Sequence, residues 1–307
     1  MSKFFIQLKR EFWECRASFV RTPFILAGIL MVLLLLGMMP FQNQIGSFIE
    51  RERMEHQDEV QQGTQFLEGL RIDGATGEAP EYLIHGLAGV YSLFILVLLL
   101  VLAFYFSDAL YSDRRDQSIL FWKSLPVAER TTVLAKLVAG TAGAPIFYAA
   151  AALATGAFYL LVILVYAKLF WSLPMPGIGA VVVAFLSSTI GLILGWWFLV
   201  LWFLPLFCWL LFSSAVARKA PFLTALGIPL GLMVLEGWTF GTVYLLDALK
   251  DQVTAGLYHL ESLAHHPGSL GERLTSTFSS VQFWVGLVAS VGLLSACTWL
   301  RHNRWEL

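Results

Sequence analysis

Glu236 is the only acidic residue inside the long apolar blocks of this sequence. A carboxylate surrounded by hydrocarbon is costly unless it is neutralised, paired or turned towards the interior of a helix bundle. It could therefore line a pathway or a dimer interface, and Glu236→Gln is then expected to reduce transport at normal membrane levels. Equally, it could be a protonated side chain hydrogen-bonded to Trp238, Thr239 or a neighbouring helix. The sequence favours neither interpretation.

Other residue types show no arrangement typical of a metal site, a catalytic nucleophile or a nucleotide site. Cys15, Cys208 and Cys297 are far apart, and the six histidines show no ligand spacing with carboxylates or cysteines. The phosphate-binding motif Gly-x-x-x-x-Gly-Lys-Ser/Thr does not occur. We therefore expect no metal, no cofactor and no catalytic residues in this chain. Energy for any activity must come through another chain or from an ion gradient.

The composition is that of a membrane protein. Of 307 residues, 58% are hydrophobic and 13% are charged, with a mean hydropathy of +0.71, whereas soluble domains are about 45–50% apolar and about 25% charged. Acidic and basic residues nearly cancel, 21 against 20, which argues against a nucleic-acid partner. Because the apolar residues form uninterrupted blocks, we expect a single all-α transmembrane domain with lipid as a partner.

Six apolar blocks are long enough to span a bilayer, which needs about 20 residues. The stretch 177–217 is too long for one span and slightly short for two, so we expect a helix at the outer interface over 178–194 and a break near Gly195. The predicted spans are about 23–40, 86–107, 137–167, 195–216, 222–246 and 281–300.

The distribution of basic residues predicts the orientation of these spans. With six spans, 14 of the 20 Lys and Arg residues lie on one side of the membrane, and basic connections stay in the cytoplasm. Both termini are therefore predicted to be cytoplasmic. Residues 41–85 and 247–280 become outer loops, and residues 108–136 become a cytoplasmic loop.

Residues 2–21 predict an amphipathic helix at the membrane interface that leads directly into the first span. It could be a generic anchor or could have a specific mechanical role. Its apolar residues at helical spacing are Phe4, Phe5, Leu8, Phe12, Cys15 and Phe19.

The loop 108–136 contains a charged run, Asp113–Asp116, followed by an apolar patch, Ile119–Trp122. Pro126 ends the helix at this point, and a new helix is expected to start near Glu129 and run into the third span. An apolar patch ringed by charge suits the docking of a soluble partner. Alternatively, its aromatic residues lie in the lipid headgroup layer.

This order of elements, with Asp-Arg-Arg-Asp-Gln-Ser-Ile-Leu-Phe-Trp-Lys-Ser-Leu-Pro in the first cytoplasmic loop and Ala-Arg-Lys-Ala-Pro at 217–221, resembles the permease subunit of type-2 ABC exporters. The resemblance implies a connecting helix at the N-terminus and a coupling helix that docks on a separate ATPase. It also implies a dimeric pathway, two ATPase subunits that hold ATP and Mg, and a bacterial inner-membrane location. The residues to which it assigns coupling are Asp113, Arg114, Arg115, Asp116, Phe121, Trp122, Lys123 and Ser124.

Other functions fit the sequence less well. An ion-coupled carrier would predict inverted repeats and several buried ionisable groups, and the sequence indicates neither. An intramembrane enzyme would need paired catalytic groups at membrane depth, where only Glu236 is found. A non-transporting membrane anchor is a further alternative.

Overall fold

The long apolar blocks of the sequence form helices in a computed structural model of the chain. It describes residues 3–37, 81–115, 128–169, 178–265 and 278–303, and these contain helices and no strand. Five of the described helices are long and apolar enough to cross a membrane: Ala17–Gly37, Gly86–Arg115, Glu129–Tyr166, Pro221–Phe240 and Val281–Asn303. The protein is therefore an α-helical membrane protein, which confirms the predicted class.

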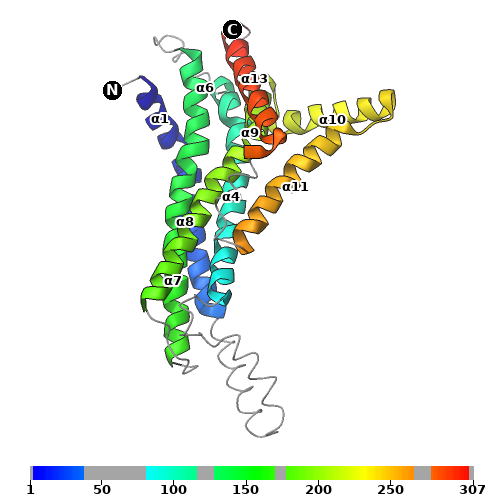
Figure 1. Cartoon of the computed structure of the whole chain (residues 1–307). Helices are drawn as coiled ribbons and strands as arrows, with labels where there is room; N and C mark the ends of the chain where they lie inside the picture. The colour runs from blue at the N-terminus through cyan, green and yellow to red at the C-terminus, as the bar shows by residue number, and fades with distance from the viewer. Residues whose placement is uncertain (1–2, 38–80, 116–127, 170–177, 266–277, 304–307) are drawn as a thin grey trace.

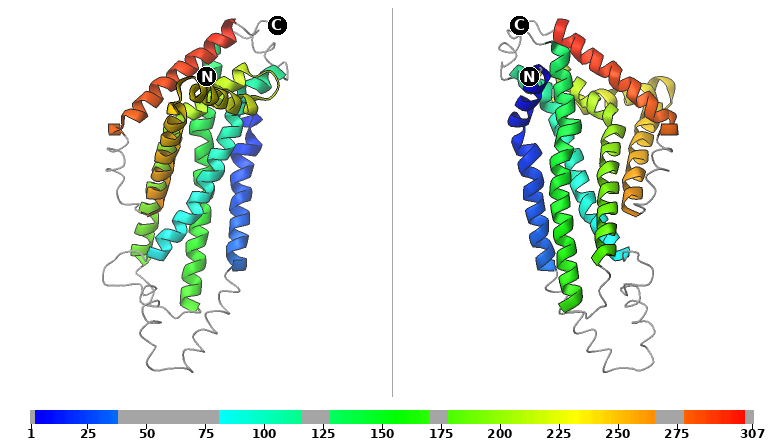
Figure 2. Two further views of the ribbon diagram at one scale, coloured as in Figure 1. Left: turned by 90° about the vertical axis from the view of Figure 1, so that its right-hand side faces the viewer. Right: turned by 60° about the vertical axis from the view of Figure 1, so that its left-hand side comes forward.

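The first four passes of the chain run in alternating directions along one bundle (Figures 1 and 2). Helix α1 (Lys3–Glu14) leads through a π-helical turn, η1 (Ala17–Arg21), into the first span, and α4 (Glu81–Arg115) returns beside it. Both termini lie at the same end of this bundle, which we call the terminal end.

The third pass starts at the terminal end and is one continuous helical run. It consists of α6 (Glu129–Val138), a π-helical turn η2 (Ala139–Gly143) and α7 (Ala144–Leu169). Helix α6 starts at Glu129, where the sequence places the helix start after Pro126. The π turn has the sequence Ala-Gly-Thr-Ala-Gly, whose small side chains let neighbouring helices approach closely.

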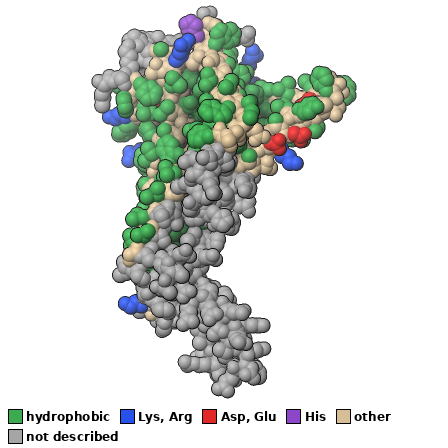
Figure 3. All heavy atoms as spheres, in the orientation of Figure 1, with side chains coloured by type: hydrophobic (Ala, Val, Ile, Leu, Met, Phe, Trp, Pro, Cys, Tyr) green, Lys and Arg blue, Asp and Glu red, His purple; other side chains and the backbone are tan. Residues whose placement is uncertain are grey.

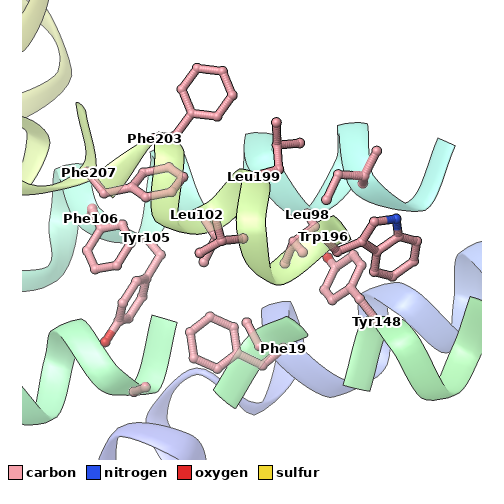
Figure 4. Close-up of a cluster of buried hydrophobic side chains, with 14 of the residues drawn as sticks. Phe19, Leu98, Leu102, Tyr105, Phe106, Tyr148, Trp196, Leu199, Phe203 and Phe207 are labelled. Atoms are coloured by element: carbon pink, nitrogen blue, oxygen red, sulfur yellow. The ribbon is translucent and has the colours of Figure 1, made fainter. Parts of the chain in front are cut away.

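Aromatic and aliphatic side chains fill the space between these passes (Figure 4). Phe19, Leu98, Leu102 and Phe106 are fully buried, and Trp196 from the fourth pass is 2% exposed. The Phe19 ring meets Tyr105 edge to face at 4.9 Å between centroids, a geometry that aromatic pairs favour. The core therefore fixes the first, second and fourth passes to one another.

The fourth pass corrects the predicted division of residues 178–216. Helix α8 (Ile178–Trp202) passes straight through Gly195, and the break comes at Phe203, before α9 (Leu204–Val216). The two helices meet at 49°. Pro205 lies in the first turn of α9, where its missing N–H is tolerated.

The predicted span 222–246 is also corrected. Helix α10 (Pro221–Phe240) ends at Gly241, whose φ of 65° is a left-handed conformation that favours glycine. The chain then reverses into α11 (Tyr244–His265), so that part of the predicted outer loop 247–280 is helical. The two helices form a V-shaped hairpin that projects from the bundle (Figure 1).

Helix α11 returns to the bundle and fastens the break in the fourth pass. The Gln252 side chain donates to the Trp202 carbonyl at 2.9 Å, and the Trp202 indole N–H donates to the Gln252 carbonyl at 3.0 Å. Gly256 faces the Phe203 ring so closely that an added Cβ would come within 2.5 Å of it. Backbone polar groups at the break are thus satisfied within the protein.

Helix α13 (Val281–Asn303) completes the described chain and ends at the terminal end beside α6 and α9. Much of the surface over the helices is hydrophobic, and the acidic side chains visible in Figure 3 gather on the hairpin. Exposed apolar side chains such as Val288 and Val234, both 71% exposed, are suited to contact with lipid.

Candidate functional site

Six ionisable side chains from four helices meet at the terminal end of the bundle. We call this group the charge cluster. Its members are Arg10 and Glu11 of α1, Asp113 of α4, Glu129 and Lys136 of α6, and Arg301 of α13.

Asp113 lies at the centre of the charge cluster. Its Oδ1 is 3.4 Å from Lys136 Nζ and 3.6 Å from Arg10 Nη2, and its Oδ2 is 3.3 Å from Arg301 Nη1. One carboxylate thus contacts cations from α1, α6 and α13. Asp113 is only 5% exposed, so its charge needs such partners to be tolerated.

Arg301 contacts two carboxylates with different parts of one guanidinium. Its Nη1 reaches Asp113, and its Nε lies 2.6 Å from Glu129 Oε2. Asp113 lies near the end of α4 and Glu129 is the first residue of α6. A planar guanidinium suits this bridging geometry better than an ammonium group does. Arg301 therefore holds together both flanks of residues 116–127.

Glu11 and Lys136 form the second half of the charge cluster. Lys136 Nζ is 3.0 Å from Glu11 Oε1 and donates to Oε2 at 3.1 Å, and each residue is 2% exposed. The Tyr105 hydroxyl lies 3.3 Å from Glu11 Oε2 and 3.1 Å from the Lys136 carbonyl. Burial raises the pKa of Glu11 above its usual value, although the Lys136 ammonium opposes this shift.

Polar contacts extend along α1 on the same face. Gln7, 6% exposed, donates from Nε2 to Thr132 Oγ1 of α6 at 3.0 Å. The half-buried Phe12 ring packs near Gly143, where an added Cβ would overlap it. The predicted apolar face of this helix is thus partly wrong. The most buried residues of α1 are the polar Gln7 and Glu11, whereas Phe5, a member of the predicted face, is 63% exposed.

Of the residues assigned to coupling, Asp113, Arg114 and Arg115 are described. Arg114 caps the end of α9, because its Nη2 donates to the carbonyls of Ser214 and Ala217, both at 2.7 Å. Arg115 is exposed and lies 6.0 Å from the centre of the Tyr111 ring. Asp116, Phe121, Trp122, Lys123 and Ser124 lie outside the described residues.

Glu236 lies at the end of α10, where its carboxylate caps the start of α11. Oε1 accepts from the Tyr244 N–H at 2.7 Å and from the Thr242 hydroxyl at 3.0 Å, and Oε2 accepts from the Leu245 N–H at 3.1 Å. The first backbone N–H groups of a helix are otherwise without partners. Of the predicted partners, the structure shows a neighbouring helix, α11, and not Trp238 or Thr239, and these contacts give Glu236 a role in shaping the hairpin.

The sequence analysis missed five of the six members of the charge cluster, because it used the basic residues only to orient the spans and Glu129 only to mark a helix start. The missed residues are Arg10, Glu11, Glu129, Lys136 and Arg301. The charge cluster also corrects the expectation that the chain lacks several buried ionisable groups. One signal was present: Gln7 and Glu11 occupy positions three and four residues from Phe4, Leu8 and Cys15, where a buried helix face continues.

Comparison with known proteins gives no relative on which to base a function. The chain matches no family model, no curated protein and no solved structure. The site is therefore interpreted from its own geometry.

Proposed function

We propose that this chain is the membrane-spanning permease subunit of an ATP-binding cassette exporter. It forms a substrate pathway as a dimer with a second permease copy or homologue, and two separate ATPase subunits hold ATP and Mg and drive it. The resemblance of residues 113–126 and of the element order to type-2 ABC exporters supports this proposal.

The observation that carries the proposal is the bridge made by Arg301 between Asp113 and Glu129. A segment that receives force must be mounted rigidly, so that its displacement moves helices rather than bending a loop. Here both flanks of residues 116–127 are joined to α13 by Arg301, and Asp113 is joined to α1 through Arg10. A push on this segment would thus be passed to four helices at once.

The basic residues favour an inward-facing terminal end. Lys9, Arg16, Arg130 and Arg218 are exposed there or near it, and basic connections remain on the cytoplasmic side. The proposal therefore places both termini in the cytoplasm and the chain in the inner membrane of a bacterium. An ATPase subunit in the cytoplasm would then meet residues 116–127.

An ion-coupled carrier is the second candidate, since such carriers use buried ionisable groups and Glu11 and Asp113 are buried carboxylates. Against it, both carboxylates are paired with Lys136, Arg10 or Arg301 and lie at one end of the bundle. Carrier sites lie near the middle of the bilayer. Dependence of the activity on ATP separates the two candidates.

The test is purification of the tagged chain from bacterial membranes in mild detergent, with ATP hydrolysis and co-purified proteins measured. We expect an ATP-binding cassette ATPase with the wild-type chain, and its loss in the variant Phe121→Ala plus Trp122→Ala. An aromatic hot-spot residue at an interface contributes about 2 kcal/mol or more, so the loss of two such residues should weaken binding by about a thousandfold.

The matched control is Trp238→Ala plus Phe240→Ala, which removes two exposed aromatic rings from α10. This control should retain the ATPase. Retention of the ATPase by the Phe121 and Trp122 variant would refute the docking assignment. Absence of any such ATPase from the wild-type preparation would refute the exporter itself.

A further inference from the structure

Helix α1 turns its polar side towards the protein and a mixed aromatic and basic side outwards. The inward side carries Gln7 and Glu11, which are 6% and 2% exposed. The outward side forms a continuous stripe at helical spacing, which we call the outer stripe. Its members are Phe5, Ile6, Lys9 and Trp13 of α1 and Arg16, which lies between α1 and the π turn η1.

The outer stripe is too apolar for a surface that faces only water. Phe5 is 63% exposed, Ile6 58% and Trp13 66%. The polar side of the same helix is already engaged by α6 and α4, so a rotation that would bury these rings would break the contacts of Glu11.

The position of the outer stripe along the chain places it at the membrane boundary. The span Ala17–Gly37 begins directly after it and, at about 1.5 Å per residue, is about as long as the hydrocarbon layer is thick. Arg16 and Trp13 lie within one helical turn of its start, at the level of the lipid headgroups. Aromatic rings and basic side chains are typical of that level.

The exposed charges of the outer stripe have one sign. Lys9 and Arg16 are exposed, and Arg16 lies over the Trp13 ring at 5.9 Å from its centre. The acids of α1 do not cancel these bases: Glu11 is paired with Lys136, and Glu14 is held by Arg10 at 2.6 Å.

We propose that the outer stripe of α1 is a binding surface for anionic phospholipid. Arg16 and Lys9 contact headgroup phosphates, the Trp13 ring lies at the boundary with the acyl chains, and Phe5 and Ile6 lie farther along the helix, against the headgroup layer. Each base near an anionic surface strengthens the interaction by about fivefold at physiological salt. The proposal requires only that α1 continues into a membrane span, and it is independent of ATP-driven transport.

The test uses the full chain in nanodiscs of phosphatidylcholine and phosphatidylglycerol. A fluorophore is placed on Ala17→Cys, an exposed position beside the outer stripe, after Cys15, Cys208 and Cys297 are changed to alanine. Quenching of this fluorophore is measured in two sets of discs. Only the phosphatidylglycerol is brominated in the first set, and only the phosphatidylcholine is brominated in the second. At equal mole fraction, we expect several-fold stronger quenching by the anionic lipid, weakened by high salt.

Two variants make this test specific. Lys9→Gln plus Arg16→Gln should abolish the preference, whereas Lys9→Arg plus Arg16→Lys should keep it. Arg218→Gln plus Lys219→Gln removes the same charge from an exposed connection elsewhere and should also keep the preference. Equal quenching by both lipids in the unsubstituted stripe would overturn the proposal. An equal loss of the lipid preference in the Arg218 and Lys219 variant would also overturn it. An absence of quenching by either lipid would overturn it as well, because it would mean that protein covers the outer stripe.

Discussion

Asp113 and Glu129 bind the same guanidinium group, that of Arg301, although Arg301 lies 188 residues from Asp113 and 172 from Glu129 in the chain. The two acids flank residues 116–127, so a single side chain of α13 connects the two helices that precede and follow this segment. Lys136 and Arg10 then connect Asp113 to α6 and α1. The terminal ends of four helices thus depend on one group of charges.

Removing the central carboxylate should destabilise the protein strongly. Asp113→Asn keeps the volume of the side chain but leaves Lys136 and Arg301 with less compensating charge in a buried site. Loss of one partner of a buried ion pair costs about 3–5 kcal/mol, which should appear as a lower melting temperature in detergent. Asp108→Asn, an exposed acid on the same helix, should change stability by less than about 0.5 kcal/mol. Similar melting of the two variants would contradict a central role for Asp113.

Glu11 should make the stability of the protein depend on pH. Burial raises its pKa above 4.5 in the folded chain, so the unfolded chain releases this proton more readily. The contribution is fully present below the ordinary pKa and is lost as pH rises through the folded pKa. The difference in unfolding free energy between wild type and Glu11→Gln should therefore fall as pH increases from about 4.5. A difference that stays constant with pH would show that burial does not shift this group.

The close approach of α1 to the π turn η2 should be sensitive to one methyl group. A Cβ added at Gly143 would overlap the Phe12 ring, so Gly143→Ala should cost about 1–3 kcal/mol through overpacking. Phe12→Leu combined with Gly143→Ala should recover part of this loss. At Gly89, where nothing lies within 4 Å of an added Cβ, alanine should be neutral or stabilising. Equal melting temperatures for the Gly143 and Gly89 variants would rule out this contact.

Glu236 should protect the start of α11 from hydrogen exchange. Glu236→Ala removes the acceptor for the N–H groups of Tyr244 and Leu245, so these amides should exchange faster while the core of α4 is unchanged. Asp251→Ala, an exposed acid further along α11, serves as the control and should leave Tyr244 and Leu245 protected. Unchanged exchange in the Glu236 variant would mean that the cap does not hold the hairpin.

Cys15 should resist alkylation. Burial raises the pKa of its thiol from 9.0 to about 12, which leaves about a thousandfold less thiolate at neutral pH. Higher thiolate nucleophilicity offsets part of this, so reaction with iodoacetamide should be about 40-fold slower than at an ordinary thiol. Ala17→Cys, exposed two residues away, provides the comparison by mass spectrometry. Equal rates at the two positions would contradict the half-buried environment of Cys15.

Long apolar blocks were sufficient to predict the helical membrane class. The break in the fourth pass was misplaced because Gly191 and Gly195 are tolerated within a buried helix. The actual break at Phe203 is fixed by Pro205 together with contacts from Gln252 and Gly256 of α11. These are tertiary contacts between distant segments, and hydropathy does not report them. Gly241 was a visible helix-ending signal, but the apolar residues that continue to Leu246 concealed it.

The charge cluster was harder to predict than the helices. Glu11, Lys136 and Arg301 each lie near the end of an apolar block, where charged residues normally face water or headgroups. Their burial results from four helix ends meeting at one place, and the pairing of Lys136 with Glu11 joins residues 125 positions apart. A single sequence contains no periodicity that links such positions.

The chain order of the charge cluster also has a consequence for biogenesis. Arg301 is translated after the three other helices of the cluster, and at about 5–20 residues per second it follows Lys136 by roughly 10–30 s. During this interval the acids at the ends of α4 and α6 lack their shared cation. Closure of this end is therefore a late step of membrane insertion, and in a nascent chain arrested before α13 Glu129 would lack its Arg301 partner, whereas Asp113 would keep Lys136 and Arg10.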